Sequence, residues 1–288
     1  MDMEDNKTQA NNMRGGLLPH VEDKRDFDHE TVFGSVKPIE LPDEYIVKGR
    51  KWIHQQYDSD LCAAMTTTGV SEDQEQVRLS PEYQFAKIKE IMGDPFGWGA
   101  SLRIACQSLV KYGSLEESIS PYNLDIANRN YIADWKHWSK DLDVQAREHK
   151  KQSYFGIKDR SYDLYDSIRS ALWLNKDFNR SIVSGALWRF GWDTDDGVIP
   201  VEYGEHGTPH AFKICGWDDK GLVCQLSNGV DVGNVGFFYM PRKVANKELT
   251  YGNFMFIDID PDVAKEMHKY NKLVAYLVAY IKKLFKNI

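Results

Sequence analysis

The sequence predicts an α+β protein with two segregated lobes, because helical patterns fill its first half and short apolar runs fill its second. Apolar residues recur every three or four positions in SPEYQFAKIKEIMG (80–93) and SLRIACQSLVKYG (101–113). Strand-length runs such as HAFKICGWD (210–218) and NFMFIDI (253–259) follow later. No internal repeat interrupts this order, so one α-rich lobe and one β-rich lobe are expected.

The helices are expected in chain order from their end signals. The first begins near Ser59, where an Asp-Ser-Asp run is typical of an N-cap. The second begins at Ser80, with a proline at its first helical position, and the third ends on Gly113. A fourth amphipathic helix is expected over RSYDLYDSIRSALWL (160–174). Strands are then expected over 180–190, 210–218, 221–227, 235–241 and 253–259.

Composition restricts the class of protein. The 288 residues are 42% hydrophobic, which is enough for one large domain or two packed lobes. A net charge of −7 argues against a general nucleic-acid binder. No run has the roughly 18 apolar residues of a membrane span, and the N-terminus does not resemble a secretory signal. An intracellular or virion-associated location fits better than secretion.

Cysteine usage supports that expectation. Four cysteines in a chain of this length imply no disulfide framework. Cys215 and Cys224 flank a predicted hairpin, and a disulfide between them is the less favoured alternative. Their spacing lacks an accompanying histidine pair, so no zinc site is expected.

Three segments are expected along the chain. Residues 1–40 form an N-terminal arm, and residues 41–260 form the main domain, with a helical lobe over about 53–125 and a β lobe over about 150–260. Residues 261–288 form an amphipathic helix with apolar residues at three- and four-residue spacing. This helix either packs on its own domain, self-associates or docks on a partner through 263–288, or lies on a membrane surface.

The residues with catalytic potential are one cysteine and one distant histidine. Cys62 stands at a predicted helix start, where the helix dipole favours thiolate, and His210 opens an apolar strand. A thiolate and an imidazole brought together form a nucleophile and its acid or base. The alternative is that Cys62 is a small buried hydrophobe and His210 a structural residue. Spacing alone does not decide between them.

The order of several short motifs resembles that of the papain-like cysteine peptidases. Gln56 precedes Cys62 by six residues, as in that family, and a Leu-Ser-Pro helix start follows at 79–81. The family's Pro-Tyr, its His-Ala strand and its Gly-x-x-Gly turn before an aromatic strand then appear in SPY, HAFKICGWDD and GNVGFFYMP. RDFD (25–28) and LPDEYIV (41–47) resemble the lead-in of members with a short propeptide.

This resemblance implies a fold and a reaction. The fold is two-lobed, with a helical first lobe and an antiparallel, β-barrel-like second lobe. Cys62 would attack a peptide carbonyl, His210 would protonate the leaving amine, and the Gln56 amide would donate to the oxyanion. Water would then release the thioester. The substrate would be a peptide or protein, and neither a cofactor nor a metal is expected.

The sequence departs from the family pattern at the residue that orients the imidazole. Counting back from the Gly-x-x-Gly of 233–236 places the family's asparagine at Leu226, which accepts no hydrogen bond. Asn228 is the candidate replacement. Ser59 stands where the family has a disulfide-forming cysteine, and Ala63 where it has an aromatic residue.

Two further features have competing interpretations. Gly97, Trp98 and Gly99 lie where the resemblance expects the backbone of the substrate cleft, although a plain tight turn explains them equally well. The acidic run at 193–197 lacks the register of a calcium loop and is expected to be a solvated turn. The alternative to a peptidase is a catalytically degenerate papain-like domain with a structural or binding role, for example in a virus particle, docking through its C-terminal helix.

Overall fold

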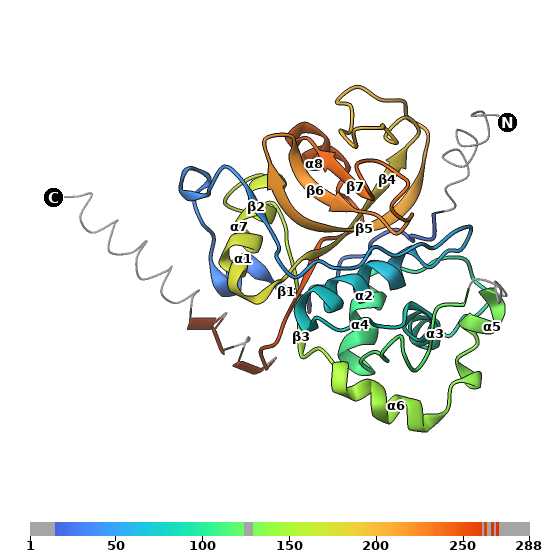
Figure 1. Ribbon diagram of the computed structural model, residues 1–288. Helices are drawn as coiled ribbons and strands as arrows, with labels where there is room; N and C mark the ends of the chain where they lie inside the picture. Colours follow the sequence, from blue (N-terminus) through green and yellow to red (C-terminus); the bar gives the residue numbers. More distant parts are fainter. Residues whose placement is uncertain (1–14, 124–128, 261, 264–265, 268, 271–288) are drawn as a thin grey trace, which may run out of the picture.

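The computed structural model describes residues 15–123 and 129–260, together with residues 262, 263, 266, 267, 269 and 270. Its α-helices are α1 (His29–Phe33), α2 (Cys62–Glu75), α3 (Pro81–Met92), α4 (Leu102–Lys111), α5 (Arg129–Ala133), α6 (Lys140–Ala146), α7 (Leu164–Leu174) and α8 (Arg242–Glu248). Its strands are β1 (Phe27–Asp28), β2 (Tyr45–Ile46), β3 (Ser153–Gly156), β4 (Ile182–Arg189), β5 (Gly207–Asp218), β6 (Gly221–Gln225), β7 (Phe237–Met240) and β8 (Phe254–Ile257). The predicted α+β fold with a helical and a β-rich lobe is confirmed (Figure 1).

Local end signals place the helices α3 and α4. The Ser80 side chain accepts from the N–H of Tyr83, and Gly93 ends α3 with a φ of 69°. Ser101 caps α4 in the same way. The Trp-containing stretch 130–150, for which no element was expected, holds α5 and α6.

The start of α2 differs from the prediction. The helix begins at Cys62 rather than near Ser59, and no side chain caps it. The polar residues expected to cap it have other partners: the Ser59 hydroxyl donates to the Gln56 carbonyl, and Asp60 accepts from Gly99 and Arg129. The first backbone N–H groups of α2 are therefore left for another acceptor.

The strands form one sheet in the order β1-β3-β8-β4-β5-β6-β7, and β2 pairs with the end of β5. Neighbouring strands are antiparallel except for the pair β1 and β3. The described strands form an open sheet rather than the barrel-like lobe expected. Closure needs two edge strands that pair with each other, and β1 contributes only two residues from the N-terminal arm.

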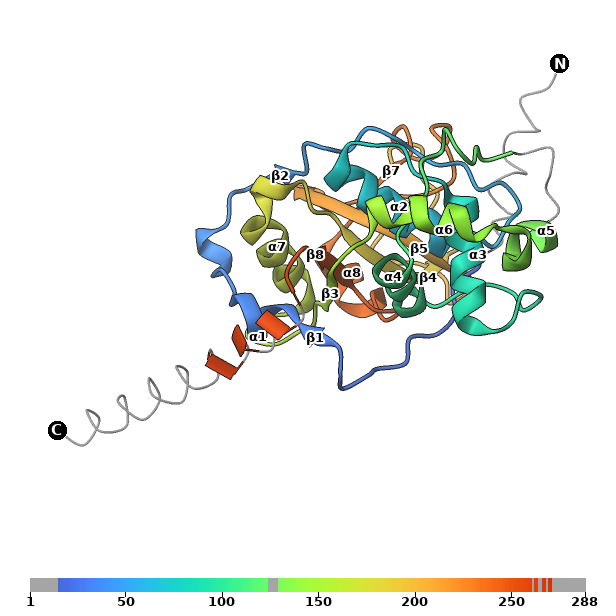
Figure 2. The same ribbon diagram turned by 90° about the horizontal axis from the view of Figure 1, so that it is seen from below.

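Alternating side chains place a core on each side of the sheet. Ala211 and Phe256 pack with α2, α3 and α4, whereas Phe212 and Met255, their neighbours in sequence, pack in the core of the β lobe. Figure 2 shows α2 lying along β5 in the view from below. The shared sheet thus holds the start of α2 beside β5.

The described part of the N-terminal arm lies along the body. Arg103 of α4 donates to Asp23 and to Asp26, each at 2.7 Å, and β1 pairs with β3. The predicted C-terminal helix at 261–288 falls almost wholly outside the described residues. Within them, no helix has the length and apolar character needed to cross a membrane.

All four cysteines are free thiols, and each is buried. A bulge in β5 puts Ile214 rather than Cys215 opposite Cys224. The two side chains instead donate to backbone carbonyls, at Val223 and Leu222. The disfavoured disulfide is therefore absent.

Candidate active site

Cys62 lies at the first turn of α2, fully buried where the two lobes meet. The backbone of Ala211, Gly16 and Ala63 lies near its sulfur and favours the thiolate. Ala211 belongs to β5 and Gly16 to the N-terminal arm, so three distant segments converge on the thiol. Burial raises the pKa of Cys62 to about 11, although these backbone groups oppose the shift.

His210 stands on β5 next to Ala211 and is also fully buried. Its Nδ1 lies 2.7 Å from the Ala211 carbonyl oxygen. Ala211 is therefore the residue next to both groups: its backbone favours the ionised sulfur of Cys62, and its carbonyl oxygen lies 2.7 Å from the ring of His210. The pairing of Cys62 with His210 as nucleophile and base stays a prediction.

The electrostatics of this closed arrangement favour a neutral pair. Burial lowers the pKa of His210 to about 4, against the opposing effects of the Ala211 carbonyl and the Asn228 side chain. With a thiol pKa of about 11, only about one Cys62 in ten thousand is ionised at pH 7. Water in the cleft would relieve both shifts, since both arise from desolvation first.

Asn228, rather than Leu226, lies beside the imidazole. The Asn228 side chain raises the pKa of His210, although neither Asn228 Oδ1 nor His210 Nε2 makes a hydrogen bond of regular geometry within the described residues. Leu226 is buried in the core of the β lobe. Counting back from the Gly-x-x-Gly motif indicated residue 226 because it assumed a continuous strand. In the structure β6 ends at Gln225, and the chain turns before residue 228.

Gln56 is buried and fixed from both lobes. Its Oε1 accepts from the Ser227 hydroxyl at 2.6 Å, and its Nε2 donates to the Ser59 carbonyl at 3.0 Å. The backbone N–H of Gln56 also donates to Ser227, and neighbouring Gln55 forms a bridge with Asn228. Gln56 and Asn228 are thus positioned by one junction between the lobes.

The segment 97–100 contacts the backbone of the N-terminal arm, and its role as a substrate-binding backbone stays a prediction. Trp98 Nε1 donates to the Gly15 carbonyl at 2.7 Å. The Ala100 N–H donates to the Gly16 carbonyl at 2.7 Å, and the Ala100 carbonyl accepts from Leu18 at 2.9 Å. Residues 15–18 therefore lie along this segment, with Gly16 near the sulfur of Cys62. We refer to the space between this segment and Cys62, which the arm fills, as the cleft.

Only glycine fits at two positions of the arm. A Cβ on Gly15 would lie 1.9 Å from the Pro209 carbonyl oxygen, and one on Gly16 would lie 2.2 Å from the Asp60 carbonyl oxygen. Both obstacles are backbone atoms, which do not move aside as a flexible side chain does. Two consecutive glycines in an otherwise polar tail were the sequence signal for this contact, and it was overlooked.

The carbonyl groups of the arm already have partners. That of Gly15 accepts from Trp98 Nε1, and that of Gly16 accepts from the Ala100 N–H. A nucleophilic thiolate needs a carbonyl whose oxygen is directed at the oxyanion donors. In the closed form these two oxygens are bonded to residues 98–100 instead.

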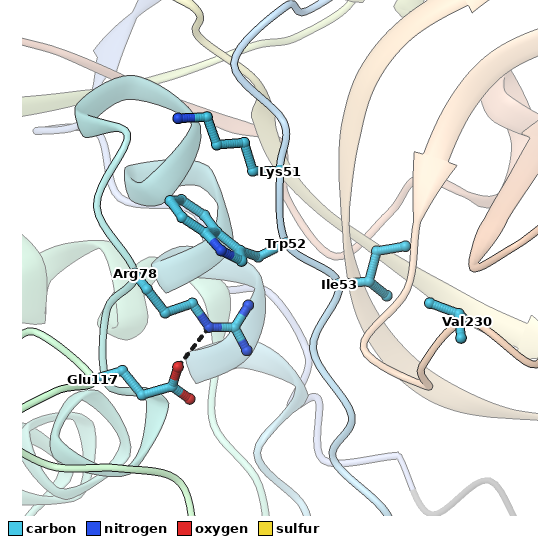
Figure 3. A pocket seen from close by; sticks show the side chains of 6 residues that line it. All are labelled: Lys51, Trp52, Ile53, Arg78, Glu117 and Val230. Carbon is cyan, nitrogen blue, oxygen red and sulfur yellow. Dashed lines mark hydrogen bonds and ion pairs between the residues drawn. The ribbon is translucent and has the colours of Figure 1, made fainter.

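A separate hollow of about 460 Å³ opens where the lobes meet beyond this site (Figure 3). Lys51, Trp52 and Ile53 line its centre, between an ion pair of Arg78 with Glu117 and the side chain of Val230. Arg78 also lies 3.7 Å from the carboxylate of buried Glu72. The Arg78 guanidinium lies between two carboxylates and is neutralised by them. The six residues that line the hollow include no pair of a nucleophile and a base.

The other candidates have structural roles. His54 pairs with Glu72 at 3.0 Å, and Asp193 of the acidic run accepts from Trp188. Within the described part of the chain, no group of histidine, cysteine or acidic side chains is arranged to hold a metal.

Comparison with known proteins agrees with the fold described above. At the level of sequence, neither a family model nor a curated protein matches this chain. Among solved structures, the chain is similar to xylellain, a cysteine protease from Xylella fastidiosa, with a TM-score of 0.69 and 19% identity over 85% of this chain and 96% of that one. It is also similar to procathepsin B S9 from Trypanosoma congolense, with a TM-score of 0.60 and 16% identity over 88% of each chain. Procathepsin L 3 of Tenebrio molitor gives a TM-score of 0.56 and 16% identity, over 90% of this chain and 80% of that one.

These similarities establish that the chain has the papain-like fold. The fold expected from the order of sequence motifs is thereby confirmed.

Proposed function

We propose that this chain is a cysteine peptidase of the papain-like type, kept closed by residues 15–18 of its own arm. One observation supports the proposal: a buried thiol at a helix start and a buried imidazole on β5 both lie next to the backbone of Ala211, and residues 16–18 pair with Ala100 nearby. A structural domain would have no need for these groups to converge there.

The proposed reaction uses residues from both lobes. With the arm displaced, Cys62 attacks the substrate carbonyl while its proton passes to His210. The Cys62 N–H at the uncapped start of α2 and the Gln56 amide donate to the oxyanion. His210 then protonates the leaving amine, and water hydrolyses the thioester. Asn228 orients the imidazole throughout.

The test compares thiols in an opened protein. Gly16→Val displaces the arm, and Cys62→Ser is then added in that background, with Cys106→Ser as the matched control. Cys106 is a buried thiol of the same core, and burial raises its pKa well above the ordinary value. We expect the opened protein to hydrolyse a fluorogenic peptide, Cys62→Ser to lower turnover at least about 10³-fold, and Cys106→Ser to leave it unchanged.

A peptidyl vinyl sulfone gives the second measurement. In the opened protein it should modify Cys62 much faster than Cys106 across neutral pH. Equal rates, together with no peptide hydrolysis, would show a papain-like domain that has kept the cleft and lost the chemistry.

A further inference from the structure

An ionic cluster lies behind the wall of the cleft. Asp60 precedes Cys62 by two residues, Lys89 belongs to α3, and Arg129 begins α5. Asp60 and Lys89 are both fully buried. Arg129 donates two hydrogen bonds to the Asp60 carboxylate, from Nε at 3.0 Å and from Nη2 at 2.9 Å. We call Asp60, Lys89 and Arg129 the clasp.

The clasp binds the backbone of residues 97–99. Lys89 Nζ donates to the carbonyl oxygens of Gly97 at 2.6 Å and of Gly99 at 2.5 Å. The Gly99 N–H donates to Asp60 Oδ2 at 2.5 Å, and Arg129 also donates to the Gly97 carbonyl. Hydrogen bonds to charged groups are the stronger kind, so this loop is held firmly.

The consequence falls on the next residue, Ala100. Gly99 has a φ of 72°, so the chain turns between the clasp and Ala100. Both polar groups of Gly99 bind the clasp, and this fixes the turn from which Ala100 follows. There the Ala100 N–H meets the Gly16 carbonyl, and its carbonyl meets the N–H of Leu18.

We propose that Asp60, Lys89 and Arg129 are positioning residues that direct the backbone of Ala100 at a peptide in the cleft. This role rests on the proposed function. In the closed form the arm binds Ala100, and in the open form a substrate peptide would take its place. Hydrogen bonds of the charged Asp60 attach the cleft wall to the segment before Cys62. In the same segment, Ser59 stands where the family resemblance expects a disulfide-forming cysteine.

The first measurement needs no catalysis. Amide hydrogen exchange in the full-length chain reports the bonds from Ala100 to Gly16 and from Leu18 to Ala100. Lys89→Met removes the donor to two wall carbonyls and should speed exchange of both amides at least about tenfold. The matched control is Lys87→Met on the same helix, because Lys87 is 2% exposed and pairs with Glu90 and Asp143 instead. It should leave both amides unchanged.

The second measurement separates binding from chemistry in the opened Gly16→Val protein. Lys89→Met should raise KM for a peptide about tenfold with little change in kcat, since it weakens backbone binding and touches neither Cys62 nor His210. Asp60→Asn and Arg129→Gln should do the same if Lys89→Met does not fold. The Lys87→Met protein should keep the KM of its parent.

The outcomes distinguish the two proposals. Faster exchange in the clasp variants of a chain that never hydrolyses peptide would support positioning and reject the peptidase. Unchanged exchange and unchanged KM in folded clasp variants, with normal turnover in the parent, would reject positioning and keep the peptidase. Equal effects of Lys87→Met and Lys89→Met would also reject the positioning role, because the faster exchange would then come from a general destabilisation of α3.

Discussion

At the residue scale, the site depends on which side chain stands beside His210. Its ring is bonded to the Ala211 carbonyl on one side, and Asn228 lies near it in a loop whose end is fixed to Gln55. Leu226, the position indicated by motif counting, contributes to the core of the β lobe instead. Of these two positions, residue 228 is therefore the one whose side chain we propose to orient the imidazole.

Two substitutions in the opened protein separate these positions. Asn228→Ala should lower kcat about tenfold, because it removes the amide whose proximity raises the pKa of His210, with little change in the free energy of unfolding. Leu226→Asn should not raise activity, and it should cost about 1–3 kcal/mol of stability by burying an amide without partners. Peptide turnover and urea unfolding measure the two effects. A gain of activity in Leu226→Asn would contradict the assignment of Asn228.

The charge of Lys89 gives a pH dependence. Desolvation lowers the pKa of Lys89 to about 8, helped by Arg129 and opposed by Asp60 and Asp94. Above pH 8 Lys89 loses its charge and donates more weakly to the carbonyls of 97–99, so KM of the opened protein should rise. Lys89→Met should abolish this rise, and Lys87→Met should keep it.

The same titration acts on stability with the opposite sign. The folded protein has the lower Lys89 pKa, so between pH 8 and the ordinary value of 10.5 the unfolded chain binds more protons, and this group favours folding as pH rises. KM and Tm should therefore be measured over the same pH range. A rise in KM that occurs only where Tm falls would contradict a positioning role.

At the element scale, the arm and the wall pair as two short extended segments. Leu17 forms a parallel bridge with Ala100, and the arm passes between Asp60 and Pro209, where only glycine fits. Burial is the largest cause of the pKa shifts of Cys62 and of His210, and Gly16 of the arm lies near the sulfur of Cys62. We infer that the arm contributes to the desolvation of the thiol.

Opening the arm should therefore activate the protein. Gly16→Val should raise both peptide turnover and alkylation of Cys62 at neutral pH at least tenfold, because a side chain at residue 16 overlaps the Asp60 backbone. Gly204→Val is the matched control, since a Cβ there meets nothing within 4 Å. Equal rates in the two variants would show that the arm does not restrict access.

At the scale of the whole molecule, buried charges connect the lobes beneath the site. Lys213 of β5 donates to Asp73 of α2 at 2.7 Å, and Ser181 donates to the same carboxylate at 2.5 Å. Lys213 and Asp73 are 3% and 1% exposed as side chains. Loss of either partner would leave the other charge buried between the lobes.

Lys213→Met alone should destabilise the protein by about 3–5 kcal/mol, because Asp73 then has no cation beside it. Adding Asp73→Asn should recover much of this loss, since no buried charge remains and the amide oxygen still accepts from Ser181. Chemical denaturation measures both variants. Equal stability of the single and double variants would show that the charge of Asp73 is not the cause.

Much of the fold was predictable from local pattern. Ser80 and Gly93 mark the ends of α3 by their own side-chain and backbone preferences, and short apolar runs marked β4, β5 and β8. The two-residue strands β1 and β2 were not predictable, because such strands exist only through their partners. The start of α2 was misjudged because Asp60 serves the cleft wall instead of the helix.

The sequence by itself determined the α+β order, the papain-like fold, and a short set of chemically capable residues that included Cys62 and His210. Only the tertiary structure decided that Asn228 reaches the imidazole, that Lys89 faces the cleft wall, and that the glycines of the arm lie on the thiol. Periodicity and end signals act between residues a few positions apart. These three contacts join segments separated by at least ten residues in the chain, and their distances are set by packing of the two lobes on one shared sheet.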